Sequence, residues 1–255
     1  KVCSDIPSTL SYRNDTMFNA VEDIAKKYHD YICYDFMGSK TTYKQFVSQV
    51  EICARALKAI GIRRDDKITI CMPNCPQTVI MFYAVNLVGG IANMVHPLSS
   101  ENEIEFFIKE SGSIAAVTLD QFYHKFEAIR QNVDLSNVII ASIKDELSKP
   151  LKAGYMLTEG RKISKIPKDA PVIRWADFLR LGLNYRWKYR CEKAGGDPAV
   201  ILYSGGTTGT TKGILLSNYN FNALAAQIIA TNPMFHPGDK MLAVMPMFHG
   251  FGLGV

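Results

Sequence analysis

The sequence predicts an α/β fold in which βαβ units form a mostly parallel sheet flanked by helices. Apolar runs of strand length alternate with longer runs of helical periodicity, and capping residues stand at the ends of several helical runs. Of the 255 residues, 47% are hydrophobic and 21% are charged, which is ordinary for a globular protein. No apolar run approaches the roughly 20 residues that a membrane-spanning helix needs.

The N-terminal part of the chain, as far as Gly61, predicts two helices around a pair of short strands. We expect, in order, a helix over 17–28, a strand over 31–36, a tight turn over 37–40 into a short strand, and a helix over 43–60. Asp15 or Thr16 can cap the first helix, whose apolar residues fall on one face. Thr42 can cap the second helix, which ends at Gly61 as a C-terminal cap would.

The middle of the chain predicts the parallel sheet. We expect strands over 67–72, 91–95, 114–118 and 138–141, with helices over 76–87, 101–111 and 120–131 between them. Pro73 and Asn74 open the first of these helices, and Ser100 and Glu103 have the spacing of a capping box. Strands separated by helices at this spacing form βαβ units, so they are expected to be parallel.

The last quarter of the chain predicts three more strands and a helix. Residues 199–203 and 214–216 have the composition of buried strands. Ser217 or Asn218 can cap a helix that continues to about residue 230. A final strand is expected over 240–245.

A loop rich in glycine and threonine, Tyr203–Gly213, connects the first two strands of this region. Its eleven residues include four glycines, four threonines, one serine and one lysine, with no acidic residue. Glycines can present successive backbone N–H groups to an anion, hydroxyls add donors, and Lys212 adds a charge suited to phosphate oxygens. The composition indicates a polyphosphate-binding loop.

Two other interpretations of this loop are weaker. A Gly/Thr-rich stretch can be a plain flexible connection, but buried strands on both sides hold this one in position. A Walker A loop requires Gly-Lys-Ser/Thr and leads into a helix. Here Thr211 precedes Lys212 and a strand follows, so the loop is of another kind.

The loop resembles the phosphate-binding loop of the adenylate-forming superfamily: acyl-CoA synthetases, aryl-CoA ligases, luciferases and peptide-synthetase adenylation domains. The usual pattern there is aromatic, Ser/Thr, Ser, Gly, Thr, Thr, Gly, any residue, Pro, Lys, Gly. This sequence departs at Gly205, where serine is commoner, and at Thr211, where proline is commoner. The Gly-Gly form with the proline replaced resembles the bacterial fatty acyl-CoA ligase branch.

Other stretches carry the same resemblance. Residues 68–74, 89–90 and 93–98 are similar to the N-terminal half of acyl-CoA synthetases. Pro246–His249, followed by a glycine-rich apolar run, is similar to the family's next motif, in which the histidine lies beside the carboxylate and the ATP phosphates. The resemblance therefore favours a site role for His249 over a structural one. The remaining histidines have no such support.

The resemblance implies an enzyme that activates a carboxylate with ATP as an acyl-adenylate and then transfers the acyl group to CoA. The implied cofactor-binding residues are Ser204, Gly205, Gly206, Thr207, Thr208, Gly209 and Lys212, and the implied catalytic residue is His249. Mg²⁺ would bridge the phosphates, and no ligand for it is predicted. A medium- or long-chain fatty acid is the favoured substrate. The alternatives are an aryl or other acid, and a non-catalytic nucleotide- or acyl-binding relic.

The resemblance covers nearly the whole chain. It implies that residues 1–255 are the N-terminal portion of an adenylate-forming domain, with a subdomain boundary near 190–198. The family's adenine-binding Tyr-Gly-x-Thr-Glu motif and ribose-binding aspartate motif do not occur in the sequence, and the C-terminal domain with its catalytic lysine is absent. We expect that the 255-residue chain alone forms no adenylate.

Residues 149–193 form a basic segment with twelve Lys/Arg and four Asp/Glu, in a chain whose net charge is +5. Its tryptophans and tyrosines are consistent with a peripheral contact to anionic lipid headgroups. The favoured interpretation is a solvated stretch and a short helix that packs Trp175, Phe178 and Leu181 onto the body. Nucleic acid is not expected as a partner, because no recognition motif accompanies the charge.

The six cysteines form no regular framework. Cys71 and Cys75 lack a second pair or a nearby histidine, so reduced structural thiols and no metal site are expected. Because no signal-peptide pattern opens the chain, a cytoplasmic location is expected, with peripheral membrane contact as the open alternative. The sequence does not predict the oligomeric state.

Overall fold

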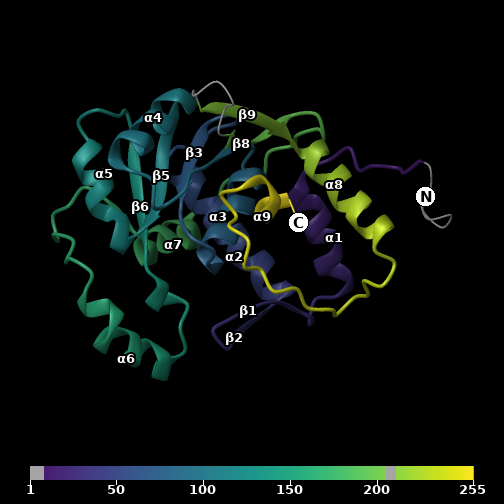
Figure 1. The fold of residues 1–255 in the computed structure, drawn as a ribbon, viewed down its shortest axis with the longest axis horizontal. Coiled ribbons are helices and arrows are strands. Elements are labelled where there is room, and N and C mark those ends of the chain that lie inside the picture. Colours follow the sequence, from purple (N-terminus) through teal and green to yellow (C-terminus); the bar gives the residue numbers. More distant parts are fainter. Residues whose placement is uncertain (1–8, 205–210, 255) are drawn as a thin grey trace.

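A computed structural model describes residues 9–204 and 211–254 of the chain (Figure 1). Its strands are β1 (Ile32–Phe36), β2 (Ser39–Thr42), β3 (Lys67–Cys71), β4 (Ile91–Met94), β5 (Ser113–Leu119), β6 (Asn137–Ala141), β7 (Ile173–Arg174), β8 (Pro198–Ser204) and β9 (Lys212–Ser217). Among these residues, β1 and β2 form a hairpin, and the others form one sheet in the order β7-β6-β5-β3-β4-β8-β9. The β8–β9 pairing is antiparallel and the other five are parallel. The predicted α/β fold with a mostly parallel sheet is confirmed.

Four helices begin at a capping residue that the sequence predicts. The helices are α1 (Met17–Lys27), α2 (Tyr43–Ala59), α3 (Pro76–Leu87), α4 (Glu101–Ser111), α5 (Tyr123–Ile129), α6 (Lys149–Leu157), α7 (Trp175–Asn184), α8 (Asn218–Thr231) and α9 (Gly250–Gly254), with 3₁₀ turns η1 (Asp120–Phe122), η2 (Ile143–Asp145) and η3 (Glu159–Arg161). The side chains of Thr16, Thr42, Ser100 and Ser217 each accept a hydrogen bond from the backbone N–H three residues later. These bonds satisfy N–H groups that have no partner inside the helix.

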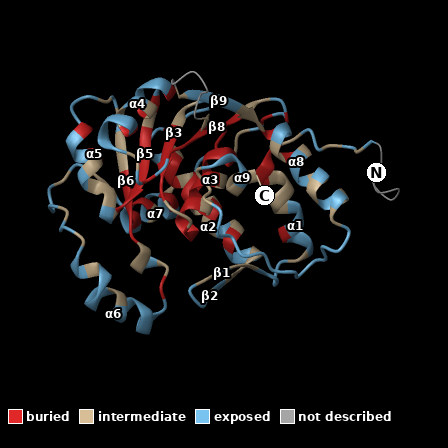
Figure 2. Cartoon of the chain, in the orientation of Figure 1, coloured by how far each residue is buried: buried red, intermediate tan, exposed pale blue. Residues whose placement is uncertain are grey.

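Helices cover both faces of the sheet. Ala115 and Val117 of β5 belong to a buried cluster with α2, α3 and α7, whereas Ala116 between them belongs to a second cluster with α4 and α5. This alternation is the period-2 pattern of a strand that is buried on both faces. Figure 2 shows the buried residues concentrated in the sheet and in α3, which lies at the centre of the larger cluster.

The helix α7 packs closely against α2. Trp175 and Phe178 are buried as predicted, but the prediction for Leu181 was wrong, because its side chain is 40% exposed. At 100° per residue, Leu181 lies to the side of the arc that Trp175, Phe178 and Gly182 share. A Cβ atom on Gly182 would overlap the carbonyl oxygen of Ile52, so the absence of a side chain at Gly182 permits this approach.

The predicted strand over 240–245 does not form. These residues have no regular secondary structure, and Leu242 is 83% exposed. A strand needs a neighbour that completes its backbone hydrogen bonds. Within the described residues, this segment pairs with neither edge of the sheet.

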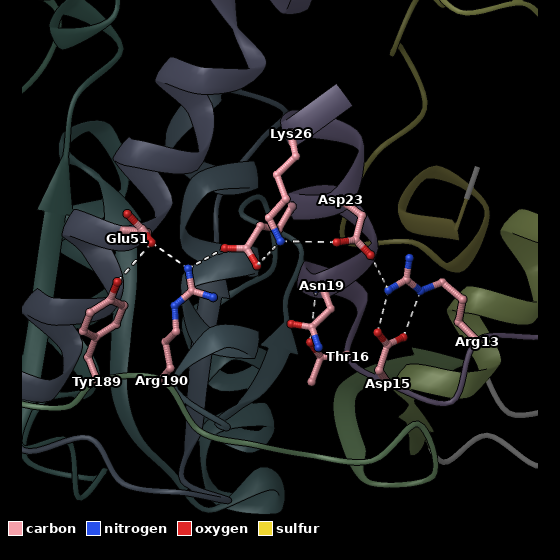
Figure 3. A network of polar contacts seen from close by, with 10 residues as sticks. Arg13, Asp15, Thr16, Asn19, Asp23, Lys26, Glu51, Tyr189 and Arg190 are labelled. Carbon is pink, nitrogen blue, oxygen red and sulfur yellow. Dashed lines mark hydrogen bonds and ion pairs between the residues drawn. The ribbon is translucent and has the colours of Figure 1, made fainter. Parts of the chain in front are cut away.

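The segment that leads into β8 is tied to α1 and α2 by a network of charged groups (Figure 3). Arg190 lies between Glu22 of α1 and Glu51 of α2, and the hydroxyl of Tyr189 donates to Glu51 at 3.0 Å. Its hydrogen bond to Glu22 raises the pKa of Arg190, and the same bond lowers the pKa of Glu22. The network therefore attaches the segment around Arg190 to α1 and α2 while both Arg190 and Glu22 are charged.

The helix α8, which follows β9, is attached through two buried asparagines. Asn86 of α3 donates to Asn218 at 2.7 Å. The oxygens of Asn86 and Asn218 accept the backbone N–H groups of Phe18 and Met17, at 3.1 and 3.2 Å. Both ends of the β8–β9 hairpin are thus fixed to the body of the protein.

Candidate active site

The carboxyl ends of three adjacent parallel strands define one edge of the sheet. β3 pairs with β4, and β4 pairs with β8, all in the same direction. Asn74 and His96 follow β3 and β4, and Ser204 ends β8. Ligands of open α/β sheets bind at this edge. These three residues are therefore the natural starting point for a site.

The predicted phosphate-binding loop connects β8 to β9. Ser204, the last residue of β8, pairs in register with Lys212, the first residue of β9. The hairpin thus places the serine hydroxyl and the lysine ammonium at the two ends of the same loop, and Lys212 is exposed. The other predicted loop residues, Gly205, Gly206, Thr207, Thr208 and Gly209, lie outside the described residues.

The C-terminal end of strand β8 is anchored to α4 through Tyr203. Its ring lies against that of Phe107, with 4.2 Å between the ring centres, and its hydroxyl donates to the carbonyl of Phe107 at 3.2 Å. Burial raises the pKa of Tyr203 to about 12. On β9, a Cβ atom on Gly213 would stand 3.3 Å from this ring, which suits a glycine there.

Asn74 holds the segment that precedes His249. Its Nδ2 donates to the carbonyls of Ala243 and Met245 at 3.0 and 2.8 Å, and its Oδ1 accepts the N–H of Met247 at 2.9 Å. Both ends of the amide are used, so its orientation is fixed by three hydrogen bonds. Asn74, which follows β3, thereby positions the backbone of residues 243–247, which lie far from it in the sequence.

His96 supports the same segment from the end of β4. Its ring lies on that of Phe248, with 4.1 Å between the centres, and its Nδ1 accepts the N–H of Leu98 at 2.9 Å. Lys125 donates to two backbone carbonyls of this loop, at 3.1 and 2.6 Å. Burial, and then the charge of Lys125, lower the pKa of His96, which favours the neutral ring.

His249 lies in the turn before α9 and is exposed. Its N–H donates to the carbonyl of Pro246 at 3.0 Å, and its Nδ1 accepts the N–H of Phe251 at 3.4 Å. A Cβ atom on the next residue, Gly250, would stand 3.7 Å from the side chain of Leu202 in β8. The turn therefore lies near Leu202, two residues before Ser204 in β8, and Nε2 is the ring nitrogen that remains for a ligand.

The structure thus brings the turn of His249 near Leu202 of β8, and it adds two residues that the sequence interpretation missed. Asn74 and His96 occur within stretches quoted only as family resemblance, although a polar residue just after a buried parallel strand is itself a signal. Within residues 9–204 and 211–254, no group of three or more His, Cys, Asp or Glu side chains could hold a metal ion.

Comparison with known proteins decides the family. The model for the family described as AMP-binding enzyme matches residues 21–255. The chain belongs to this family. It is 30% identical to a long-chain fatty acid–CoA ligase of Bacillus subtilis (strain 168), over 98% of this chain and 45% of that protein. It is 27% identical to 4-coumarate–CoA ligase 1 of Arabidopsis thaliana, over 97% of this chain and 41% of that protein.

Solved structures of AMP-binding enzymes agree with the fold. The crystal structure of a long-chain fatty acid–CoA ligase from Archaeoglobus fulgidus matches 96% of this chain and 45% of that chain, with a TM-score of 0.73 and 17% sequence identity. At that identity the likeness shows the fold alone. The chain spans about half the length of the curated relatives that it matches.

Proposed function

We propose that this AMP-binding enzyme activates a fatty acid for transfer to CoA. A carboxylate oxygen attacks the α-phosphate of ATP and pyrophosphate leaves, which gives an acyl-adenylate. The sulfur of CoA then attacks the acyl carbon, its thiol proton is lost, and AMP leaves. The observation that carries the proposal is the β8–β9 hairpin, in which Ser204 and Lys212 pair in register at the carboxyl end of β8, and the turn that contains His249 lies near Leu202 of the same strand.

Neither step requires a nucleophile from the protein. Phosphoryl chemistry of this kind depends on positioning the reactants and on neutralising the charge of the leaving group. An exposed lysine opposite a serine hydroxyl, on a loop without acidic residues, fits the phosphates of a nucleotide. In this proposal Lys212 stabilises the leaving pyrophosphate, and Gly205, Gly206, Thr207, Thr208 and Gly209 provide further donors. Mg²⁺, when bound, would neutralise additional phosphate charge.

His249 is proposed to contact the carboxylate and the phosphates through Nε2. Its Nδ1 accepts a hydrogen bond within the turn, so Nε2 is available to donate to an anionic oxygen. Asn74 and His96 act as positioning residues, because they hold the backbone and the phenylalanine immediately before His249. A change at Asn74 should therefore disturb His249 without removing a group that touches the substrate.

The test is Lys212→Ala in the full-length protein, compared with Lys212→Arg. Pyrophosphate exchange, with ATP and the acid varied separately, measures the first step. We expect a loss of about tenfold or more in kcat with alanine and partial rescue by arginine, because a charged hydrogen-bond donor contributes about 1.5–3 kcal/mol. Lys44→Ala, at an exposed lysine of α2, is the matched control.

The outcome distinguishes three functions. A wild-type exchange rate in Lys212→Ala would contradict the proposed role of the loop. Exchange with 4-coumarate but not with octanoate or palmitate would favour an aryl-CoA ligase, an alternative raised by the 27% identity to the Arabidopsis enzyme. No exchange with any acid, together with measurable ATP binding, would indicate a non-catalytic nucleotide-binding protein.

A further inference from the structure

Part of the basic segment forms an arm that stands away from the sheet. We define the basic arm as residues 149–168, which comprise α6, η3 and the extended chain that follows. Figure 1 shows α6 set apart from the strands and from the other helices. No residue of the arm is buried, and Figure 2 shows α6 mostly exposed. The arm therefore presents its side chains to the surroundings and adds little to the core.

The arm concentrates positive charge. It contains six Lys/Arg and one acidic residue, Glu159. Lys162 forms an ion pair with Glu159 at 2.7 Å. The other five cations, Lys149, Lys152, Arg161, Lys165 and Lys168, form no ion pair within the parts of the chain that the structure describes. Each of these five is exposed, so the charge is displayed to solvent.

Apolar side chains stand among these charges. Met156 is 54% exposed and Leu157 is 61% exposed. At 100° per residue, both lie on the arc of α6 that also carries Lys149, whereas Tyr155 lies on the opposite side and is partly buried. A helix surface that combines exposed apolar side chains with lysines is typical of helices that lie in a membrane interface.

The arm is fixed at its base. On the entry side, Leu147 is buried and Gln77 of α3 donates to the carbonyl of Ser142 at 3.0 Å. On the exit side, Arg174 of β7 donates to the carbonyls of Ile166 and Pro167 at 3.3 and 3.1 Å. Both ends of the arm are thus attached to the body, which keeps its outer face directed away from it.

We propose that the basic arm docks on the surface of a bilayer that contains anionic lipids. The lysines and the arginine meet the headgroups, and Met156 and Leu157 enter the boundary between headgroups and acyl chains. The charge of the arm complements an anionic surface, and its exposed apolar side chains complement a lipid surface. The inference goes beyond the proposed reaction and does not depend on it, because it concerns residues outside the candidate active site.

Vesicle binding tests the role of the charges. The chain is mixed with vesicles of phosphatidylcholine alone or of phosphatidylcholine with phosphatidylglycerol, at low and high salt, and the bound fraction is measured by flotation. We expect binding to the anionic vesicles that weakens with salt. Replacing Lys149, Lys152 and Lys165 by glutamine should lower the partition coefficient by about tenfold or more. Replacing Lys27, Lys40 and Lys44, which are also exposed, should lower it by less than about twofold.

A second pair of variants tests the apolar contact. Met156→Ser with Leu157→Ser should weaken binding several-fold, whereas Met37→Ser with Leu183→Ser, at 58% and 53% exposure, should not. In a separate variant, Leu157→Trp, the fluorescence should be quenched by brominated acyl chains, and that of Leu183→Trp should be unchanged. Unfolding curves check that each variant folds.

Three results would overturn the proposal. One is equal binding to neutral and anionic vesicles. Another is equal loss of binding in the arm variant and in its lysine control. The third is a loss with the lysine variant but none with the Met156 and Leu157 variant, which would indicate a surface for a soluble polyanion such as nucleic acid. A failure of these tests leaves the pyrophosphate-exchange test of the proposed function unaffected.

Discussion

The two halves of the basic segment have the same number of positive charges and use them differently. The basic arm and residues 174–193 each contain six Lys/Arg. In the arm, one cation has a carboxylate partner among the described residues. In residues 174–193, Arg180 pairs with Asp177, Arg190 with Glu22 and Glu51, and Lys193 with Asp65, while Arg174 donates to backbone carbonyls. The first half displays its charge, whereas Arg190 and Lys193 of the second half attach the chain to its own body.

Three aromatic side chains of the second half also contribute to the fold. Trp175 and Phe178 are buried in the core, and the hydroxyl of Tyr189 is bonded to Glu51. Trp175 and Tyr189, which are among the tryptophans and tyrosines that suggested a lipid contact in the sequence, therefore stabilise the fold. The lesson is that a count of charges and aromatic residues does not locate a surface. What matters is whether opposite charges and an apolar core lie within reach of the folded segment.

The largest difference in stability between the two halves is expected when one glycine of each is replaced by alanine. Gly182→Ala would place a Cβ atom against the carbonyl oxygen of Ile52, so α7 and α2 must separate. We expect the free energy of unfolding in urea to fall by about 3 kcal/mol. Gly154→Ala in α6 is the matched control, because no atom lies within 4 Å of the added Cβ. Alanine is the better helix former, so that variant should be unchanged or slightly more stable.

Equal unfolding midpoints for the two glycine variants would contradict the packing of α7 described above. A large loss in Gly154→Ala would show instead that the arm packs on the body, which would also weaken the case for its lipid contact.

A smaller difference in stability is expected when one arginine of each half is replaced by glutamine. Arg190→Gln removes both ion pairs and leaves Glu22, whose side chain is 18% exposed, without its partner. We expect a loss of about 2 kcal/mol at pH 7, as for other hydrogen-bonded charges. Arg161→Gln in the arm is the control and should change stability by less than about 0.5 kcal/mol. Similar losses of stability in both variants would contradict the distinction between the two halves.

The loss in Arg190→Gln should depend on pH. The pKa of Glu22 is lowered in the folded protein, chiefly by its hydrogen bond to Arg190. A carboxylate with a lowered pKa stabilises the fold above its unfolded pKa of about 4.3, and this contribution is lost as the pH falls through the folded pKa. Urea unfolding at pH 7 and at pH 3 should therefore show the variant closer to wild type at the lower pH. A constant difference would contradict the ion pair.

The sequence predicts those parts of the fold that depend on neighbouring residues. Helix starts at Thr16, Thr42, Ser100 and Ser217 depend on atoms within three residues, and all four are confirmed. The expected strand over 240–245 depends on a distant partner strand, and it does not form among the described residues. Strand propensity alone could not reveal that Leu242 would be 83% exposed.

The candidate site also contains residues that local motifs predict and residues that they do not. Ser204, Lys212 and His249 were predicted from local motifs, and their roles stay predictions, as do those of Gly205, Gly206, Thr207, Thr208 and Gly209. Asn74 was missed because its partners, such as Met245, are far from it in the sequence and come close only in the folded chain. The expected subdomain boundary near 190–198 also stays a prediction.

The smallest effect is expected for vesicle binding when Trp187 is replaced. Like the apolar residues of the arm, Trp187 is an exposed side chain beside cations. It is 72% exposed, lies between Arg186 and Lys188, and contacts the ring of Tyr185 edge-on at 5.3 Å. If an exposed apolar residue beside two cations were sufficient for lipid binding, Trp187→Ser would weaken vesicle binding as much as the loss of Met156 and Leu157. We expect a change of less than about twofold, because two cations attract an anionic surface less strongly than the five displayed by the arm. A loss equal to that of the arm variant would move the lipid contact to the second half, and the distinction between the two halves would fail.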